Sequence, residues 1–451
     1  MTWLPAAVLF VAGLTAAEPP RHVAYAWQGD AGRHPGIIPA AWLTRESLGD
    51  PARLAAATAR MPKGHRIVML SHITERIHSH PGNRTVWLEA GADAVAAELD
   101  RFLAAYRGLG AELDGIVLDH EIGLSNWALG DREEPWKSIQ ADERFPALAA
   151  KLGFDDLGGV RNWRSSDRYL RWNALMSERM DGYLERAVLA PLRRHFPAAR
   201  LSNYGGCARG PAWPVPDEHG HAVYRFAHDD TVGTHQSPVL YANLINLSGN
   251  PPPGAKAYPH TPFNAFRYAV NLLRAAAAAS PAPLWPWVAY RTWRPDSGIG
   301  ITRSDLYQEV VLHAGLVGVD AFLLWNPRPW HAGQSPGDLA SDDTDASLSA
   351  CLAELDAVVG APGRKKPLSP GLADWNEDFV VTGAVAGNRR IWRLTVDPAA
   401  VPDIAAAAAQ GPDPAFRIGP RTLVFPGARL LPAGKDGSKF GRWLVGGSGP
   451  R

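Results

Sequence analysis

Short runs of apolar residues alternate with longer stretches of helical periodicity through most of the chain. A short apolar run predicts a buried strand, whereas apolar residues three or four apart predict a helix that packs on a sheet. Strands are predicted at residues 22–27, 66–71, 115–118, 200–204, 237–243, 284–289 and 320–325. Helices are predicted at residues 39–60, 92–109, 166–195, 262–279, 303–317 and 344–359.

This alternation predicts an α/β fold in which helices cover a parallel sheet. About seven or eight such repeats favour a (β/α) TIM-like barrel over an open doubly wound sheet. No GxGxxG motif follows the first predicted strand and no P-loop motif occurs, which argues against nucleotide-binding folds. Beyond about residue 367 the pattern changes to short strands, predicted at residues 379–385, 390–396, 422–425 and 442–445. We therefore expect a barrel domain at residues 18–365 and a small β-rich domain at residues 366–451.

The stretch GIVLDHEIG, residues 115–123, joins a predicted buried strand to charged residues. Side chains two apart in a strand share a face, so Asp119 and Glu121 are expected to project together. Two adjacent carboxyl groups cannot both ionise easily, so one of them should have a raised pKa. A general acid that works near neutral pH needs such a raised pKa. The alternative is a salt-bridged Asp and Glu at the end of a strand.

Polar and aromatic residues gather at the ends of the other predicted strands. They are Trp27, Tyr204, Tyr241, Tyr290, Arg291, Trp325 and Asn326. In a (β/α) barrel the active site lies at the carboxyl ends of the strands, which favours a catalytic role for Asp119 and Glu121. A long loop predicted from residue 124 to about 165 adds Trp127, and loops of this length are often functional. Packing in the core is the alternative for each aromatic residue.

The composition narrows the class of protein. The chain has 451 residues with a formal net charge of +1, which argues against a dedicated nucleic-acid-binding protein. Residues 1–17 are apolar and end in small residues, which predicts a signal peptide cleaved after Ala17. We expect a secreted or periplasmic protein that does not stay in a membrane after cleavage. The two cysteines, Cys207 and Cys351, are expected to remain separate thiols, so the core and not a disulfide framework stabilises the fold.

The histidines predict neither a metal site nor a catalytic triad. Two groups contain enough ligand-type residues for a metal site: His72, His78 and His80, and His219, His221 and His228 with Asp229 and Asp230. Their spacing matches no known pattern of metal ligands, and histidines in loops are mostly solvated. No Ser-His-Asp or Cys-His signature occurs, and Cys207 lacks an obvious base. We therefore expect no metal and no other cofactor.

Several motifs, taken in order from residue 22 to about 362, resemble the animal and venom hyaluronidases, glycoside hydrolase family 56. The segments that carry the resemblance are LDHEIGLSNWALG, SNYGGC, HDDTVGTHQSPVLYANL, WVAYRTW, FLLWNP and CLAELDAVVGAP. The chain also departs from that family. Ile122 and Gly123 stand where the family has a second acidic residue and an aromatic one, and the partners of its disulfides and its cysteine-rich tail are missing.

The resemblance implies a role for each matching residue. Glu121 would protonate the leaving glycosidic oxygen and later activate water, while Asp119 would orient the substrate's acetamido group. The acetamido oxygen would itself attack the anomeric carbon, which is the substrate-assisted exception among glycosidases. Tyr204 and Tyr241 would bind the acetamide and the sugar at the cleavage point. Trp325 would form the floor behind the N-acetyl methyl group.

Other residues would bind neighbouring sugars. Trp27 or Trp127 would stack on sugar rings, and Arg291 or Arg161 would meet a uronate carboxylate, for which a planar guanidinium is suited. The expected function is a secreted, monomeric endo-glycosidase that hydrolyses an N-acetylhexosamine-containing polysaccharide such as hyaluronan or chondroitin, by a retaining mechanism. Two alternatives remain: a polysaccharide lyase on the same barrel, and a non-catalytic glycan-binding barrel.

Overall fold

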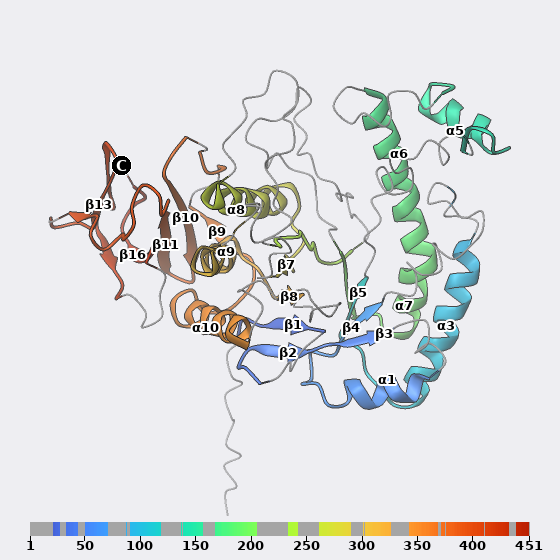
Figure 1. Cartoon of the computed structure of the whole chain (residues 1–451). Coiled ribbons are helices and arrows are strands. Elements are labelled where there is room, and N and C mark those ends of the chain that lie inside the picture. Colours follow the sequence, from blue (N-terminus) through green and yellow to red (C-terminus); the bar gives the residue numbers. More distant parts are fainter. Residues whose placement is uncertain are drawn as a thin grey trace, which may run out of the picture.

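The computed structural model places two parallel sheets at the centre of the molecule and a β-rich part at one end (Figure 1). It describes residues 21–27, 33–43, 50–70, 87, 91–118, 137, 139–156, 167–204, 233–241, 261–289, 301, 303–325, 342–368, 371–374, 376–409, 411–432 and 439–450. The predicted signal peptide lies outside these residues. No helix in the described part of the chain is long and apolar enough to cross a membrane.

Each parallel sheet has four strands. The first has the order β2-β1-β8-β7 and the second the order β3-β4-β5-β6. The strands of the first are β1 (Ala24–Ala26), β2 (Ile37–Pro39), β7 (Trp287–Val288) and β8 (Phe322–Leu324). Those of the second are β3 (Ala41–Leu43), β4 (Ile67–Leu70), β5 (Gly115–Leu118) and β6 (Arg200–Asn203).

The two sheets are connected on both sides. Only Ala40 separates β2 from β3, and its backbone N–H donates to the carbonyl of Ala26 at 2.8 Å, so the strands of both sheets run in one direction. On the other side, residues 233–241 lie between β6 and β7. The N–H of His235 donates to the carbonyl of Leu201 at 3.0 Å, and the N–H of Trp285 donates to the carbonyl of Gln236 at 2.7 Å.

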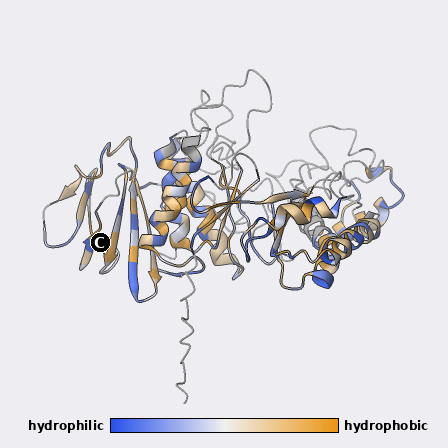
Figure 2. Ribbon diagram, turned by 90° about the horizontal axis from the view of Figure 1, so that it is seen from below, coloured by the Kyte–Doolittle hydropathy of each residue, from blue (hydrophilic) through white to orange (hydrophobic). Residues whose placement is uncertain are grey.

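Successive side chains of each strand enter different cores. In β4, Val68 belongs to a cluster formed with helices, whereas Met69 belongs to a cluster to which both sheets contribute. This shared inner cluster also contains Tyr25 of β1, Val117 of β5 and Leu323 of β8. The strands at the centre are coloured mainly as hydrophobic in Figure 2, as burial on both faces requires.

Two groups of helices cover the outer faces. The first sheet is covered by α8 (Pro262–Ala279), α9 (Ser304–Val317) and α10 (Asp342–Val358). The second is covered by α1 (Pro51–Thr58), α3 (Ala92–Gly108), α5 (Phe145–Leu152), α6 (Asp167–Leu184), the π-helix η3 (Glu185–Leu189) and α7 (Ala190–His195). The π-helix precedes Pro191, which has no N–H to continue the regular hydrogen-bond ladder, and this explains the wider turn.

The β-rich part forms two antiparallel sheets, of orders β15-β16-β11-β10-β9 and β12-β13-β14. Its strands are β9 (Lys366–Pro367), β10 (Phe379–Ala386), β11 (Arg389–Val396), β12 (Ala408–Ala409), β13 (Ala415–Ile418), β14 (Arg421–Val424), β15 (Ala428–Leu430) and β16 (Gly441–Gly446). The larger sheet packs on α9, where Val380 and Ile391 join the core of the first parallel sheet. At this seam the Arg393 guanidinium binds both carboxylate oxygens of Glu309, at 2.8 and 2.6 Å.

Three local predictions were wrong. The segment predicted as a strand at residues 237–243 forms, in its described part up to Tyr241, an isolated bridge from Val239 to Trp287 and no strand. Residues 39–60 were predicted to be helical, but Ala41–Leu43 form the strand β3, and among the described residues of this range the α-helix is Pro51–Thr58. Ala41 and Leu43 of β3 are buried in the core that the second sheet forms with its helices, and pairing with β4 makes this segment a strand. The loop predicted at residues 124–165 contains α5, in which Pro146 occupies the first turn, where proline is tolerated.

Candidate active site

Four of the predicted site residues belong to the described part of the chain. These are Trp27, Tyr204, Tyr241 and Trp325. The other four lie outside the described residues, so their placement is not reported: Asp119, Glu121, Trp127 and Arg291. The two predicted groups of histidines also lie outside them.

The carboxyl ends of the strands hold the described site residues. Trp27 follows β1 and Trp325 follows β8, and these strands are paired with Ala26 opposite Leu324. The N–H of Trp325 continues the ladder by donating to the carbonyl of Val288 at 2.9 Å. Both tryptophans therefore leave the first sheet at the same level.

Tyr204 marks the corresponding edge of the second sheet. It follows β6, and its N–H donates to the carbonyl of Leu118, the last residue of β5, at 2.8 Å. Leu118 is joined directly to Asp119 in the sequence. The hydrogen bond therefore fixes Tyr204 beside the point at which the chain enters the predicted catalytic segment.

Four aromatic rings from both sheets meet around Trp287; we call Trp27, Tyr204, Tyr241 and Trp287 the aromatic cluster. Trp27 stacks on Trp287 with ring centroids 5.1 Å apart and planes inclined by 24°. Tyr204 meets Trp287 edge-on at 5.3 Å, and Tyr241 does so at 6.5 Å. The two tyrosine rings are 6.0 Å apart. Such edge-to-face pairs each contribute about 0.5–1.5 kcal/mol beyond the burial of their area.

Sequence reasoning missed the central member of this cluster. Trp287 was predicted only as part of a strand, yet it is 1% exposed and contacts the three other rings. The alternation in LWPWVA was the available signal, because it places Trp285 and Trp287 on the same face of the strand, toward the inner cluster.

The rings of the cluster differ in exposure. Tyr204 and Tyr241 are 5% and 6% exposed, so packing accounts for most of their ring area. Trp27 and Trp325 are half-buried, and Trp325 meets the half-buried Trp42 edge-on at 6.2 Å. The arrangement thus supplies a packed aromatic wall with partly accessible indoles, which is a surface suited to stacking on sugar rings.

Within the described ranges no group of three or more His, Cys, Asp or Glu side chains could hold a metal ion. These ranges do form a pocket of about 690 Å³, but it lies at the amino ends of the strands, among residues such as His22, His65 and Arg200. It is therefore separated from the aromatic cluster by the length of the strands.

No protein-family model matches the chain, and no curated protein matches it. Among solved structures, the chain is similar to a β-galactosidase from the Antarctic haloarchaeon Halorubrum lacusprofundi, with a TM-score of 0.41, 14% identity and coverage of 67% of this chain and 50% of that one. For a GH42 β-galactosidase from G. stearothermophilus the TM-score is 0.44 and the identity 11%, with coverage of 73% of this chain and 53% of that one. For bee venom hyaluronidase the TM-score is 0.27 and the identity 13%, with coverage of 57% of this chain and 76% of that one.

The chain spans about half the length of the two β-galactosidases that it matches. All three TM-scores lie below 0.5, so these similarities establish neither a family nor an activity for this chain. Membership of the hyaluronidase family remains a prediction from the sequence motifs.

Proposed function

We propose that the chain is a secreted glycoside hydrolase whose active site combines Asp119 and Glu121 with the aromatic cluster. The observation that carries this proposal is the hydrogen bond from Tyr204 to Leu118, at 2.8 Å. It brings an aromatic wall built by both sheets next to the residue that precedes the D-x-E motif. A carboxyl pair beside aromatic rings at the carboxyl ends of parallel strands is an arrangement that suits cleavage of a glycosidic bond.

We further propose that the two parallel sheets are parts of one (β/α) barrel. The support is the direct succession of β2 and β3 on one side and, on the other, the bridges from Gln236 to Leu284 and from Val239 to Trp287 of β7. The inner cluster adds support, because both sheets contribute side chains to it. In such a barrel the two carboxyl edges form a single rim.

Within this proposal the substrate is an N-acetylhexosamine-containing polysaccharide, with hyaluronan or chondroitin as the first candidates. Glu121 protonates the leaving oxygen while the substrate's acetamido oxygen attacks the anomeric carbon. Asp119 orients the acetamide and stabilises its developing positive charge. Glu121 then removes a proton from the water that opens the cyclic intermediate, so the configuration is retained.

The remaining predicted residues take binding roles. Tyr204 and Tyr241 contact the sugar at the cleavage point, and Trp325 packs behind the N-acetyl methyl group. Trp27 and Trp127 stack on adjacent rings, whereas Arg291 pairs with a uronate carboxylate. We propose that the enzyme acts as a monomer.

A screen of glycosaminoglycans and chitin-type oligomers with the mature protein tests this proposal. A hydrolase yields new reducing ends without ultraviolet absorbance, whereas the alternative, a polysaccharide lyase, yields an absorbing double bond. A non-catalytic glycan-binding barrel would bind oligomers and leave their length unchanged. Absorbing products, or binding without cleavage across the panel, would replace the hydrolase by one of these alternatives.

A further inference from the structure

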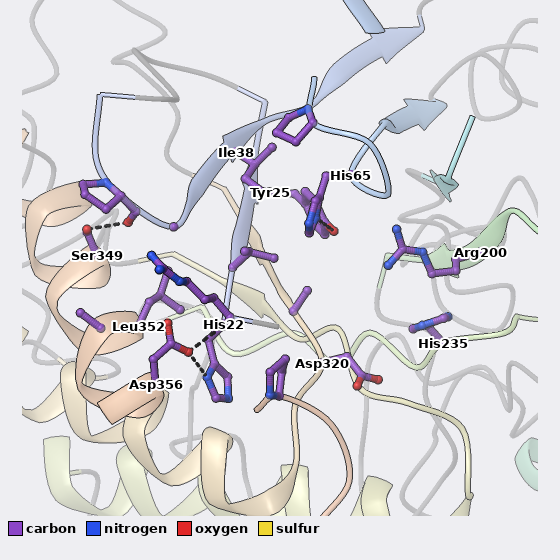
Figure 3. A pocket seen from close by; sticks show the side chains of 18 residues that line it. His22, Tyr25, Ile38, His65, Arg200, His235, Asp320, Ser349, Leu352 and Asp356 are labelled. Carbon is purple, nitrogen blue, oxygen red and sulfur yellow. Dashed lines mark hydrogen bonds and ion pairs between the residues drawn. The ribbon is translucent and has the colours of Figure 1, made fainter. Parts of the chain in front are cut away.

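A pocket of about 690 Å³, the amino-edge pocket, opens at the end of the strands opposite the aromatic cluster (Figure 3). Tyr25 of β1, His65 before β4, Arg200 at the start of β6 and Asp320 before β8 line it, and α10 closes one side with Asp356. Pockets of roughly 300–1,000 Å³ with a few convergent polar groups are typical of small-molecule sites. Nothing in the proposed glycosidase chemistry uses this edge of the sheets.

Arg200 gives the pocket a positive charge. Its guanidinium donates to the carbonyl oxygens of Gly64 and Asp114, and it lies over the ring of Trp285 at 5.0 Å. Among the described residues it forms no ion pair, although Asp320 lies close enough for the Arg200 charge to oppose the rise of its pKa. A guanidinium held by carbonyl groups and an aromatic face keeps its affinity for a carboxylate or phosphate, whose geometry it matches.

Two neutral imidazoles lie close to this charge. Burial and then the Arg200 charge lower the pKa of His235 to about 4, and the same two causes lower the pKa of His65. The Thr234 hydroxyl donates to the carbonyl of Leu201 at 3.1 Å, so its oxygen accepts from Nδ1–H of His235 at 2.8 Å. In the neutral ring Nε2 of His235 is then an acceptor, and protonation converts it into a second donor.

Two acidic groups line the pocket: Asp356 lies across from Arg200, whereas Asp320 lies closer to Arg200 and His235 (Figure 3). Asp356 accepts from the backbone N–H and pairs with Nδ1 of His22, both at 2.8 Å. Burial raises the pKa of Asp320, and the nearby positive charges of Lys365, Arg200 and Arg364 oppose that rise. The titratable groups that face the pocket or act on it are Arg21, His22, Tyr25, His65, Asp114, Arg200, His235, Asp320, Asp356, Arg364 and Lys365.

We propose that the amino-edge pocket binds a small molecule of sugar size that carries an oxyanion, with Arg200 as the principal ligand of the carboxylate or phosphate group. The volume exceeds what an inorganic anion needs, and the apolar side chains of Val23, Ile38 and Leu352 provide contacts for a carbon skeleton. Bound anion offsets the Arg200 charge, so His235 and His65 take up protons more readily when the pocket is occupied. Affinity therefore increases as the pH falls.

Thermal unfolding and calorimetric titration of the mature protein test the proposal. The probes are inorganic phosphate, glucuronate, glucose 6-phosphate and uncharged glucose. A saturable rise in Tm is expected with glucuronate or glucose 6-phosphate and not with glucose, since a ligand that binds the folded state stabilises it. The anion that responds identifies a sugar acid or a sugar phosphate as the source. Because the pKa of His235 in the free protein is about 4, its affinity is expected to rise by up to about tenfold per pH unit as the pH is lowered from 6.5 toward 4.5, with proton uptake in the calorimeter.

Variants assign the response to the pocket. Arg200→Gln is expected to weaken anion binding by at least about tenfold, since a charge-assisted hydrogen bond is lost. Ala353→Trp places a large side chain at an exposed position of α10 that lines the pocket and is expected to weaken binding as well, which covers the case in which Arg200→Gln does not fold. Arg193→Gln, at an exposed arginine of α7 paired with Glu185, should bind as the wild type does.

The result that overturns the proposal is a wild type without a saturable response to any of the charged probes. A response that survives in both pocket variants, or that equal ionic strength of sodium chloride reproduces, also overturns it. Hydrolysis of glycans is measured separately and depends on residues at the opposite edge. Failure of the amino-edge pocket therefore leaves the proposed activity untouched.

Discussion

Replacing Arg393 by methionine should destabilise the protein by about 3–5 kcal/mol, because the substitution leaves the carboxylate of Glu309 buried without a cation. Arg393 lies in β11 and Glu309 in α9, so the pair joins the β-rich part to the helices that cover the first parallel sheet. The side chains are 3% and 0% exposed. Water therefore cannot replace the lost partner.

The hydrogen bonds give the magnitude. Glu309 accepts from Nε and Nη2 of Arg393 at 2.8 and 2.6 Å and from the hydroxyl of Thr395 at 2.6 Å. Two of these three bonds disappear, and a hydrogen bond to a charged group contributes about 1.5–3 kcal/mol. The Arg393 guanidinium also lies 4.7 Å from the centre of the Trp443 ring, which adds a smaller loss.

Urea unfolding followed by circular dichroism measures the change in the free energy of unfolding. Arg389→Met, at an exposed position of the same strand, is the control and should change stability by no more than about 0.5 kcal/mol. The double variant Arg393→Met with Glu309→Leu should recover most of the loss, because an apolar pair can replace a buried ion pair. A loss below about 1 kcal/mol for Arg393→Met, or a double variant as unstable as the sum of the single ones, would refute the reasoning.

Three further predictions follow from the described residues. Burial and the nearby Arg200 guanidinium lower the pKa of His235 to about 4, so on acidification the unfolded chain protonates this histidine before the folded protein does. Through this group the free energy of unfolding should fall by about 1.4 kcal/mol per pH unit as the pH drops from 6.5 to 4. In denaturation experiments at several pH values, His235→Gln should show a correspondingly shallower slope. Gly318→Ala should destabilise the protein by more than about 1 kcal/mol, because Gly318 has φ +104° and an added Cβ would lie 2.8 Å from neighbouring backbone atoms. Gly182→Ala in α6, where an added Cβ meets nothing within 4 Å, should stabilise the protein by about 0.5–1 kcal/mol. Equal Tm values for the two variants would contradict this prediction. Tyr204→Phe keeps the ring contacts and should lower kcat/KM by about tenfold or more, as expected for one lost hydrogen bond in the transition state. An unaltered kcat/KM would remove Tyr204 from the site.

Elements with strong periodicity could be predicted closely from the sequence. The helix predicted at residues 262–279 matches α8 (Pro262–Ala279), and the strand predicted at residues 115–118 matches β5 (Gly115–Leu118). The strands at residues 37–43 could not be recognised, because each has only three residues and is defined by its pairing with β1 or β4. Helix α5 was missed because it has only eight residues and lies within a segment that was predicted as one long loop.

In the candidate sites too, some features could be predicted from the sequence and others are shown only by the structure. Tyr204 could be placed at the rim because strand-end residues share an edge in a parallel sheet, which needs no knowledge of register. The meeting of Tyr204 and Tyr241 on Trp287 depends on which strands are neighbours, and that comes only from the structure. The amino-edge pocket was not predicted at all, since Arg200 and His235 are brought together with β1 residues only by the strand order.

The central claim is that Glu121 acts as the proton donor at the rim of the sheets. The most direct test compares Glu121→Gln with His120→Gln, its neighbour in the sequence, on the glycan that the wild type degrades best. The account predicts that Glu121→Gln loses activity by about 10²–10⁴-fold with little change in glycan binding, whereas His120→Gln remains active. Degradation by Glu121→Gln at the wild-type rate would contradict it.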